Sequence, residues 1–368
     1  MSVQGSSRVS LTVRALLSVA AIASAFACSD DSTSPNKGFL GGTASDHQIG
    51  VVVNSLGKSL TLFQLGSPST QKEIPLGASS SITPTGLAVR GHFASVPLGN
   101  TASVALVDLS TQTVSRVFTF PSGNTTGSAF SDDNTLFMAN STTGVVGRAT
   151  VNQGADSIAA TDSVAAAPTA ITVSGNRVLV TSANLDENFS PIGNGIVTAI
   201  DASTMEVLGT ATMGGTNSSD AALGPDGMLY VVNTGDYVSD GSITIVNPTT
   251  MAVVQTVGGM GTGPGAIFID ANGLAYISGF FTGTLVWNTV TKTFVRGTDN
   301  PVCAKVADVC RGAFAASTNA DGDIYQVFFG SPADELPPYV FVFKGSGYVL
   351  SDSISTGSGP SAINIKTY

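Results

Sequence analysis

The amino-acid sequence predicts an all-β protein, a seven-bladed β-propeller built from four-stranded antiparallel blades, with the C-terminal strand completing the first blade. Three observations predict it: segments that repeat every roughly 42 to 51 residues, turn residues between alternating strands, and incomplete units at the two ends that complement each other. The composition agrees, because 42% of residues are hydrophobic and only 11% are charged, with 42 glycines. Such a chain can bury a large core between many short strands.

The first repeated pattern is an alternating strand, then Asp or Asn, then Thr three residues later, then a second strand. It occurs at 104–118, 197–211, 243–257 and 284–296. The aligned polar residues are Asp108, Asp201, Asn247 and Asn288. An Asp or Asn side chain can accept a hydrogen bond from the backbone two residues on, which favours a tight turn. We therefore interpret these four residues as structural.

The second pattern is a proline that opens an alternating strand, at 84–89, 168–173, 264–269 and 360–365, with weaker equivalents near Ser128, Ala221 and Ala313. Turn segments such as SDDN (131–134), GPDG (224–227), DANG (270–273) and NADGD (319–323) follow most of these strands. Each unit thus reads as four short strands, the content of a propeller blade. First strands near 84, 126, 168, 219, 264, 312 and 360 predict seven blades.

The two ends of this repeat array complement each other. The last unit holds only a first strand, at 360–366, whereas GVVVNS, SLTLFQL and KEIPL near the start read as three strands that lack one. We expect the C-terminal strand to complete the first blade. This closure would remove an open sheet edge that invites aggregation.

The runs LYVVNTG (229–235), SITIVNPTTMAVVQTV (242–257) and GPGAIFI (263–269) resemble the YVTN repeat of bacterial seven-bladed propellers. The likeness extends more weakly over residues 47–368, and it departs from the pattern at 147–164, in the third blade, where the Asx-to-Thr turn is absent. The family includes surface-layer and adhesion-type proteins, binding scaffolds and a lactonase branch. The resemblance therefore implies the fold without choosing a function.

Residues 1–28 have the layout of a bacterial export signal. Arg8 and Arg14 precede an uncharged apolar run, Ala15 to Ala27, of about 13 residues, which is shorter than the roughly 20 needed to cross a bilayer. Ala27-Cys28 resembles a lipobox, whose cysteine is acylated, although Ala25 and Phe26 depart from the usual residues. Cleavage nearby by the general signal peptidase is the alternative.

The stretch after Cys28 is polar and poor in apolar residues, as a tether should be. We expect a lipoprotein signal peptide at 1–28, a flexible polar tether at 29–46 and the propeller at 47–368. The protein would then be exported and lipid-anchored to the cell envelope, at the outer or inner membrane, facing the periplasm or the surface.

If Cys28 carries lipid, two cysteines remain, Cys303 and Cys310, and they bracket a short segment. In an oxidising compartment such a pair favours a disulfide over two free thiols. A metal site would need further ligands nearby, and the two histidines, His47 and His92, are distant in sequence.

Four expanded loops are predicted to lie on one face of the propeller: 183–195, 236–240, 303–310 and 329–338. Long loops on a rigid scaffold are where recognition is usually built, although neutral drift is an equal alternative. The candidate binding-face residues are Asp186, Glu187, Phe189, Asp236, Asp240, Asp334 and Glu335. Phe280, Phe281 and Phe329 could contact a ligand or pack between blades. Because no calcium-loop spacing is present, the carboxylates are interpreted as solvated, and we expect no metal.

Two functions remain open at this stage: a non-catalytic envelope scaffold that binds a protein, peptide or glycan, and an enzyme of lactonase or lyase type acting at the mouth of the central channel. The sequence offers no catalytic candidate, since neither a Gly-Xaa-Ser-Xaa-Gly elbow nor a phosphate loop occurs. We therefore favour the scaffold, a monomer without cofactor that touches the membrane only through lipid. The net charge of −10 and the absence of a basic cluster argue against nucleic acid.

Overall fold

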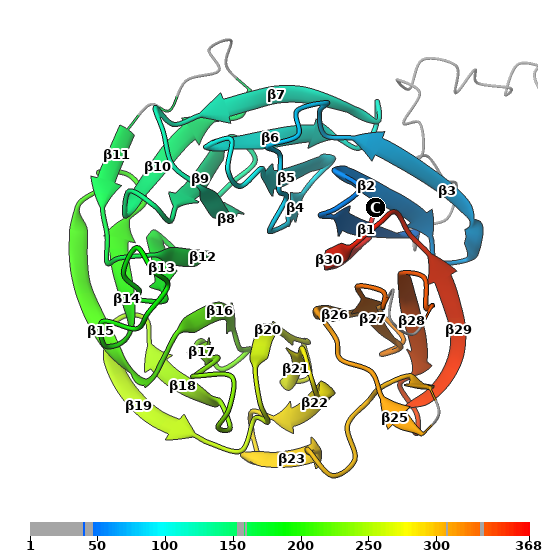
Figure 1. The fold of residues 1–368 in the computed structure, drawn as a ribbon. Helices are drawn as coiled ribbons and strands as arrows, with labels where there is room; N and C mark the ends of the chain where they lie inside the picture. Colours follow the sequence, from blue (N-terminus) through cyan, green and yellow to red (C-terminus); the bar gives the residue numbers. More distant parts are fainter. Residues whose placement is uncertain (1–39, 41–46, 153–157, 159, 307, 332–334) are drawn as a thin grey trace, which may run out of the picture. The chain divides into compact units, whose positions relative to one another are not determined.

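The structure, a computed structural model, describes residues 40, 47–152, 158, 160–306, 308–331 and 335–368. Within these residues seven four-stranded antiparallel sheets surround a central axis like the blades of a propeller, as Figure 1 shows. The predicted fold class is confirmed. No helix in the described part of the chain has the length and apolar character needed to cross a membrane.

Each blade runs from an inner strand at the axis to an outer edge strand. From inside to outside, blade 1 consists of β30 (Pro360–Thr367), β1 (Gln48–Asn54), β2 (Ser59–Gln64) and β3 (Ser67–Pro75). Blade 2 consists of β4 (Ala88–Arg90), β5 (Phe93–Pro97), β6 (Ser103–Asp108) and β7 (Thr113–Thr119). Blade 3 consists of β8 (Thr125–Phe130), β9 (Thr135–Asn140), β10 (Val145–Thr150) and β11 (Ala160–Ser163).

The remaining blades follow the same order. Blade 4 consists of β12 (Pro168–Ser174), β13 (Arg177–Ser182), β14 (Asn194–Asp201) and β15 (Val207–Thr216). Blade 5 consists of β16 (Ser218–Leu223), β17 (Leu229–Asn233), β18 (Ser242–Asn247) and β19 (Ala252–Val257). Blade 6 consists of β20 (Pro264–Ile269), β21 (Leu274–Gly279), β22 (Gly283–Asn288) and β23 (Thr293–Arg296). Blade 7 consists of β26 (Ala315–Thr318), β27 (Ile324–Phe328), β28 (Tyr339–Lys344) and β29 (Val349–Ser355).

The C-terminal strand closes the ring as the repeat arithmetic predicts. β30 pairs antiparallel with β1 in a register that places Val51 opposite Asn364, and Figure 1 shows the two chain ends of the repeat array side by side. The inner strand of blade 1 therefore comes from the other end of the sequence. The two ends of the repeat array are therefore held together by the backbone hydrogen bonds between β30 and β1 within blade 1.

The turn residues act as the sequence indicates. Each of Asp108, Asp201, Asn247 and Asn288 uses Oδ1 to accept backbone N–H groups two and three residues on, at 2.8–3.3 Å. The turns then close through a residue with positive φ, such as Met205 or Lys292. These side chains shape the hairpin between the third and fourth strands of their blades.

The hydrophobic core lies between neighbouring blades, where the two middle strands of each sheet are buried on both faces. One cluster joins Val232 and Ile245 of blade 5 to Ile277 and Leu285 of blade 6. Leu40, in the stretch predicted to be a tether, is also buried and packs in the cluster formed by blades 1 and 2. The rest of the tether and the predicted signal, including Cys28, lie outside the described residues.

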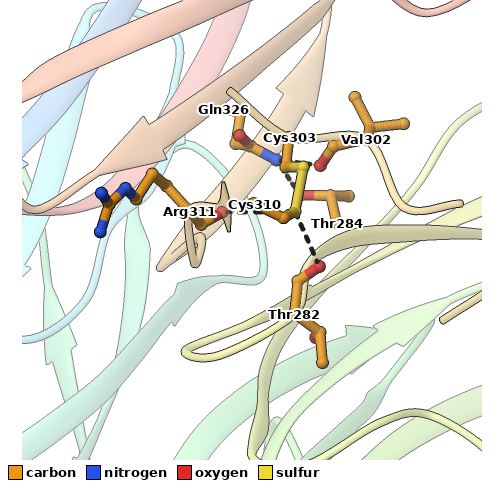
Figure 2. The surroundings of a disulfide bond; sticks show 7 residues. All are labelled: Thr282, Thr284, Val302, Cys303, Cys310, Arg311 and Gln326. Carbon is orange, nitrogen blue, oxygen red and sulfur yellow. Dashed lines mark hydrogen bonds between the residues drawn. A yellow bond between two sulfur atoms is a disulfide. The ribbon is translucent and has the colours of Figure 1, made fainter. Parts of the chain in front are cut away.

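The connection from blade 6 to blade 7 carries the predicted disulfide. Cys303 and Cys310 are bonded, with their Cα atoms 5.5 Å apart, around a small hairpin of β24 (Lys305–Val306) and β25 (Val309–Cys310). Figure 2 shows that Gln326 of blade 7 lies beside Cys303 and Val302. Its Nε2 donates to Val302 O at 2.7 Å and to Thr284 Oγ1 at 2.8 Å, so the connection is tied to both blades.

Candidate functional site

One face of the propeller carries the variable loops, and we call it the loop face. In every blade the start of the inner strand lies opposite the end of the second strand, as for Pro168 and Ser182 or for Pro264 and Gly279. The connections between blades therefore lie at the same end as the loops between second and third strands. The opposite end carries the short turns.

Aromatic rings link the loops of three neighbouring blades on this face. Tyr237 of blade 5 lies 6.4 Å, centroid to centroid, from Phe280 of blade 6. Phe280 meets Phe314 edge-to-face at 4.9 Å, and Phe314 stacks on Phe329 of blade 7 at 4.7 Å. These rings bring the predicted expansions of blades 5, 6 and 7 together, and they also pack between blades.

The loop face exposes a set of large apolar side chains, which we call the crest. It comes from the loops between second and third strands in four blades and comprises Leu56, Phe189, Ile192, Tyr237, Val238 and Phe281. Phe189 is 84% exposed and Val238 is 82% exposed. Phe189 and Tyr237 also adopt positive φ, a conformation that bulky residues seldom take.

The predicted acidic residues do not converge on one point. Asp186 Oδ1 accepts the N–H groups of Asn188 and Ser190, so this carboxylate shapes its own loop. Asp236 does the same, and backbone hydrogen bonds from Ser239 and Val238 lower the pKa of its carboxyl group.

The other predicted carboxylates are exposed or fall outside the description. Glu187, Asp240 and Glu335 lie at the surface, and Asp334 is not among the described residues. In the part of the chain that the structure describes, no group of three or more His, Cys, Asp or Glu side chains is arranged to hold a metal ion.

The central channel opens on the loop face and contains a cavity of ≈ 740 Å³. Its wall is the ring of inner strands visible in Figure 1. Hydroxyl groups at the mouth connect successive blades: Thr85 Oγ1 donates to Thr126 O at 3.2 Å, and Thr126 Oγ1 donates to Pro168 O at 2.7 Å. Thr169 Oγ1 continues the series to Ser218 O at 3.0 Å.

Blades 6 and 7 break this pattern of hydroxyl groups. We number the inner-strand positions from the residue that aligns with Pro168 and Pro264. The second position then holds Thr or Ser in five blades, but Gly265 in blade 6 and Phe314 in blade 7. The residue after the second strand is Ser55 in blade 1 and Thr234 in blade 5, but Phe280 and Phe329 in blades 6 and 7. One side of the mouth is therefore aromatic and the other side carries hydroxyls.

The third position of the inner strand shows a second departure, at Asp220. The other six blades hold Gly or Ala there, because the inner strands approach closely at the axis. A Cβ at Gly127, for example, would lie 2.8 Å from Thr169 O. Asp220 instead reaches across to blade 6, where its Oδ2 accepts the Ile267 N–H at 3.0 Å. Its Oδ1 accepts the Ala221 N–H at 2.9 Å.

The environment of Asp220 disfavours its charged form. Burial raises the pKa of its carboxyl group to about 6, although the N–H donors of Ile267 and Ala221 act in the opposite direction. Its side chain is partly exposed to the channel, but the surrounding inner strands keep it away from bulk water. Repeat alignment alone could have singled out Asp220 and Phe314, since both break a position that is otherwise small or polar.

The channel wall carries only three charged side chains among the described lining residues: Arg90, Asp220 and Lys366. Arg90 and Lys366 occupy the same level of their strands, four residues further from the loop face than Asp220, or roughly 13 Å at about 3.3 Å per residue. Arg90 Nε pairs with Asp133 Oδ1 at 2.7 Å. The lining residues include no histidine; His47 lies near Gln64 and His92 lies beside Phe93.

Comparison with solved structures supports the fold. Hydrazine synthase from Kuenenia stuttgartiensis superposes with a TM-score of 0.62 at 12% identity, covering 79% of this chain and 97% of that chain. The computationally designed Ika8 protein superposes with a TM-score of 0.59 at 12% identity, covering 86% and 87%. No protein-family model and no curated protein sequence matches the chain. At this identity the likeness concerns the seven-bladed fold alone.

Proposed function

We propose that this protein is an exported, lipid-anchored propeller that binds a protein or peptide of the cell envelope through its loop face. The observation that supports the proposal is the crest, which exposes six apolar side chains from loops of blades 1, 4, 5 and 6. Large exposed apolar side chains that gather on one face of a domain often mark an interaction site.

The backbone conformation at the crest supports the same reading. Phe189 has φ of 61° and is 84% exposed, so the fold gains little from a phenylalanine at this position. A left-handed conformation costs an ordinary residue about 1–2 kcal/mol relative to the right-handed one. A large aromatic side chain kept in a strained, solvent-facing position is accounted for by contact with a partner.

The exposed carboxylates around the crest add a preference in charge. Glu187, Asp240 and Glu335 are exposed on the loop face, and the whole chain has a net charge of −10. A partner with apolar side chains and a basic rim would be complementary in both respects. Rim charges of this kind act mainly on the association rate and on its dependence on salt.

The envelope location rests on the N-terminal sequence and on the resemblance to YVTN-repeat propellers. Acylation of Cys28 would hold the propeller at the membrane. The enzyme alternative would need an acid and a base side by side, and the described channel lining offers a single carboxylate, Asp220.

The test is affinity capture from native envelopes with the mature protein and two triple variants. One variant changes the crest (Phe189→Ser, Val238→Ser and Phe281→Ser). The matched control changes three apolar residues that are exposed on outer strands of the same blades (Val207→Ser, Val254→Ser and Val295→Ser). We expect the crest variant to lose a protein that the control retains. Equal capture by both variants would overturn the proposal.

A further inference from the structure

The mouth of the central channel combines a cavity, an aromatic wall and one carboxylate that is partly buried in the channel wall. The cavity measures ≈ 740 Å³ and is lined by all seven inner strands. Phe280, Phe314 and Phe329 form its wall at blades 6 and 7, and all three rings are half-buried. Neighbouring ring centroids lie 4.9 Å and 4.7 Å apart.

The carboxylate of Asp220 lies on the same side of the channel. The Phe280 ring covers Gly265, since a Cβ there would lie 2.9 Å from Phe280 Cζ. Asp220 binds the N–H of Ile267, two residues further along the same strand. The anion thus lies just below the aromatic wall as seen from the loop face.

Asp220 has two backbone donors but no cationic partner among the described residues. A buried carboxylate without a counter-ion is costly, and proteins usually pair or neutralise such a group. The adjacent Ser219 Oγ lines the same cavity, is buried, and makes no hydrogen bond to the described residues. The Asp220 carboxylate therefore remains available to a cationic ligand, whereas Ser219 Oγ is shielded from solvent.

We propose that this mouth binds a small organic ammonium ion, with Asp220 as its counter-ion and the three phenylalanine rings as its walls. A cation within about 6 Å of an aromatic face is attracted by the ring quadrupole, and more strongly when water is excluded. The two cationic side chains of the channel lining, Arg90 and Lys366, lie roughly 13 Å deeper. Asp220 is therefore the one charged side chain of the described lining at the mouth.

This site adjoins the crest at Tyr237, whose ring centroid lies 6.4 Å from that of Phe280, but it does not rest on partner binding there. The ammonium ion would lie inside the channel, whereas the crest side chains project from the loop tips. A variant of Asp220 should still bind the envelope partner, and the crest variant should still bind the ammonium ion.

The experiment compares two probes of matched shape, choline and its uncharged isostere 3,3-dimethylbutan-1-ol, by titration calorimetry and ligand-detected NMR on the mature protein at pH 8. We expect choline to bind and the alcohol to bind at least tenfold more weakly. Asp220→Asn and the double variant Phe280→Leu with Phe314→Leu should each weaken choline binding at least tenfold. Asp240→Asn, an exposed carboxylate on the same face, should leave it unchanged.

A pH series supplies an independent readout. Choline binding should weaken as the pH falls below about 6, where the Asp220 carboxylate takes up a proton. The strands packed against β16 are β12, β13, β14, β17 and β20, and their titratable side chains are Arg177, Asp201 and Tyr230. All three side chains belong to residues at the end of the blades that carries the short turns, opposite the loop face. Equal binding of the two probes, unchanged binding by Asp220→Asn, or no binding of choline would each overturn the proposal.

Discussion

Replacing Asp220 with asparagine should stabilise the protein at neutral and alkaline pH. In the folded protein the pKa of this carboxyl group is about 6, against an ordinary value of 3.8. Ionising it therefore costs the folded state about 2 pKa units more than the unfolded state, or about 3 kcal/mol at 1.36 kcal/mol per unit. The folded protein holds its proton more tightly, so the native state loses stability as the pH rises from about 4 to about 6, and the loss persists above that.

Asparagine keeps the shape of the side chain but cannot accept both backbone N–H groups. The unmatched amide costs about 1 kcal/mol at every pH. Because the unfolded-state carboxyl group, with a pKa of 3.8, is already about half ionised at pH 4, the net change in the free energy of unfolding should be a gain of about 2 kcal/mol at pH 8 and a loss of about 0.5 kcal/mol at pH 4. The difference between the two pH values, about 2.5 kcal/mol, is free of the hydrogen-bond contribution and is the quantity to measure.

The assay is guanidinium unfolding of the wild type and the variant at both pH values, followed by tryptophan fluorescence from Trp287. Asp236→Asn is the control, because the pKa of Asp236 is lowered in the folded state and its ionised form is favoured. That variant should lose stability at pH 8 relative to pH 4. If Asp220→Asn changes the free energy of unfolding equally at both pH values, Asp220 is not desolvated and the reasoning is wrong.

Three further predictions concern the closure, the disulfide and the anchor. Deleting residues 360–368 should prevent stable folding, because blade 1 loses its inner strand and β1 loses one of its two partner strands; thermal unfolding that matches the full chain would contradict the closure. The variant Cys303→Ser with Cys310→Ser should lower the free energy of unfolding by about 2.5 kcal/mol, from the loop-closure entropy of an eight-residue loop, as measured by denaturant titration beside untreated and reduced wild type. An unaltered midpoint would show that the loop does not constrain unfolding. Cys28→Ala should move the processed protein from the membrane to the soluble fraction in fractionated cells, and processed protein that stays with the membrane would exclude lipidation as the anchor.

Much of the architecture could be predicted because propeller blades repeat local chemistry. The Asx turns at Asp108 and Asp201 need only residues within three positions of each other, so their sequence pattern suffices. The closure followed from counting strands, since the unit at the C-terminus consists of the one strand that the first unit lacks. The pairing of Cys303 with Cys310 needed only their short separation and an oxidising compartment.

The candidate site was predicted less completely, because its groups meet across blades. The sequence predicted the loop face and placed Phe189 and Asp236 on it, but it grouped the carboxylates of the expanded loops together as candidate binding residues. In the structure the carboxylates of Asp186 and Asp236 accept backbone N–H groups of their own loops. Asp220 was not singled out, although it replaces the Gly or Ala of the other blades, because its contact with Ile267 on the neighbouring blade is visible only in the structure.

The sequence by itself determined the strands, their order, the seven-fold repeat and the closure, because these depend on alternation and turns that neighbouring residues specify. Only the tertiary structure decided which side chains share the channel mouth. Rings from the loops of blades 6 and 7 and a carboxylate from blade 5 come together there, across as many as 109 residues of sequence between Asp220 and Phe329. Burial within the ring of inner strands, which no local pattern encodes, is what raises the pKa of that carboxyl group.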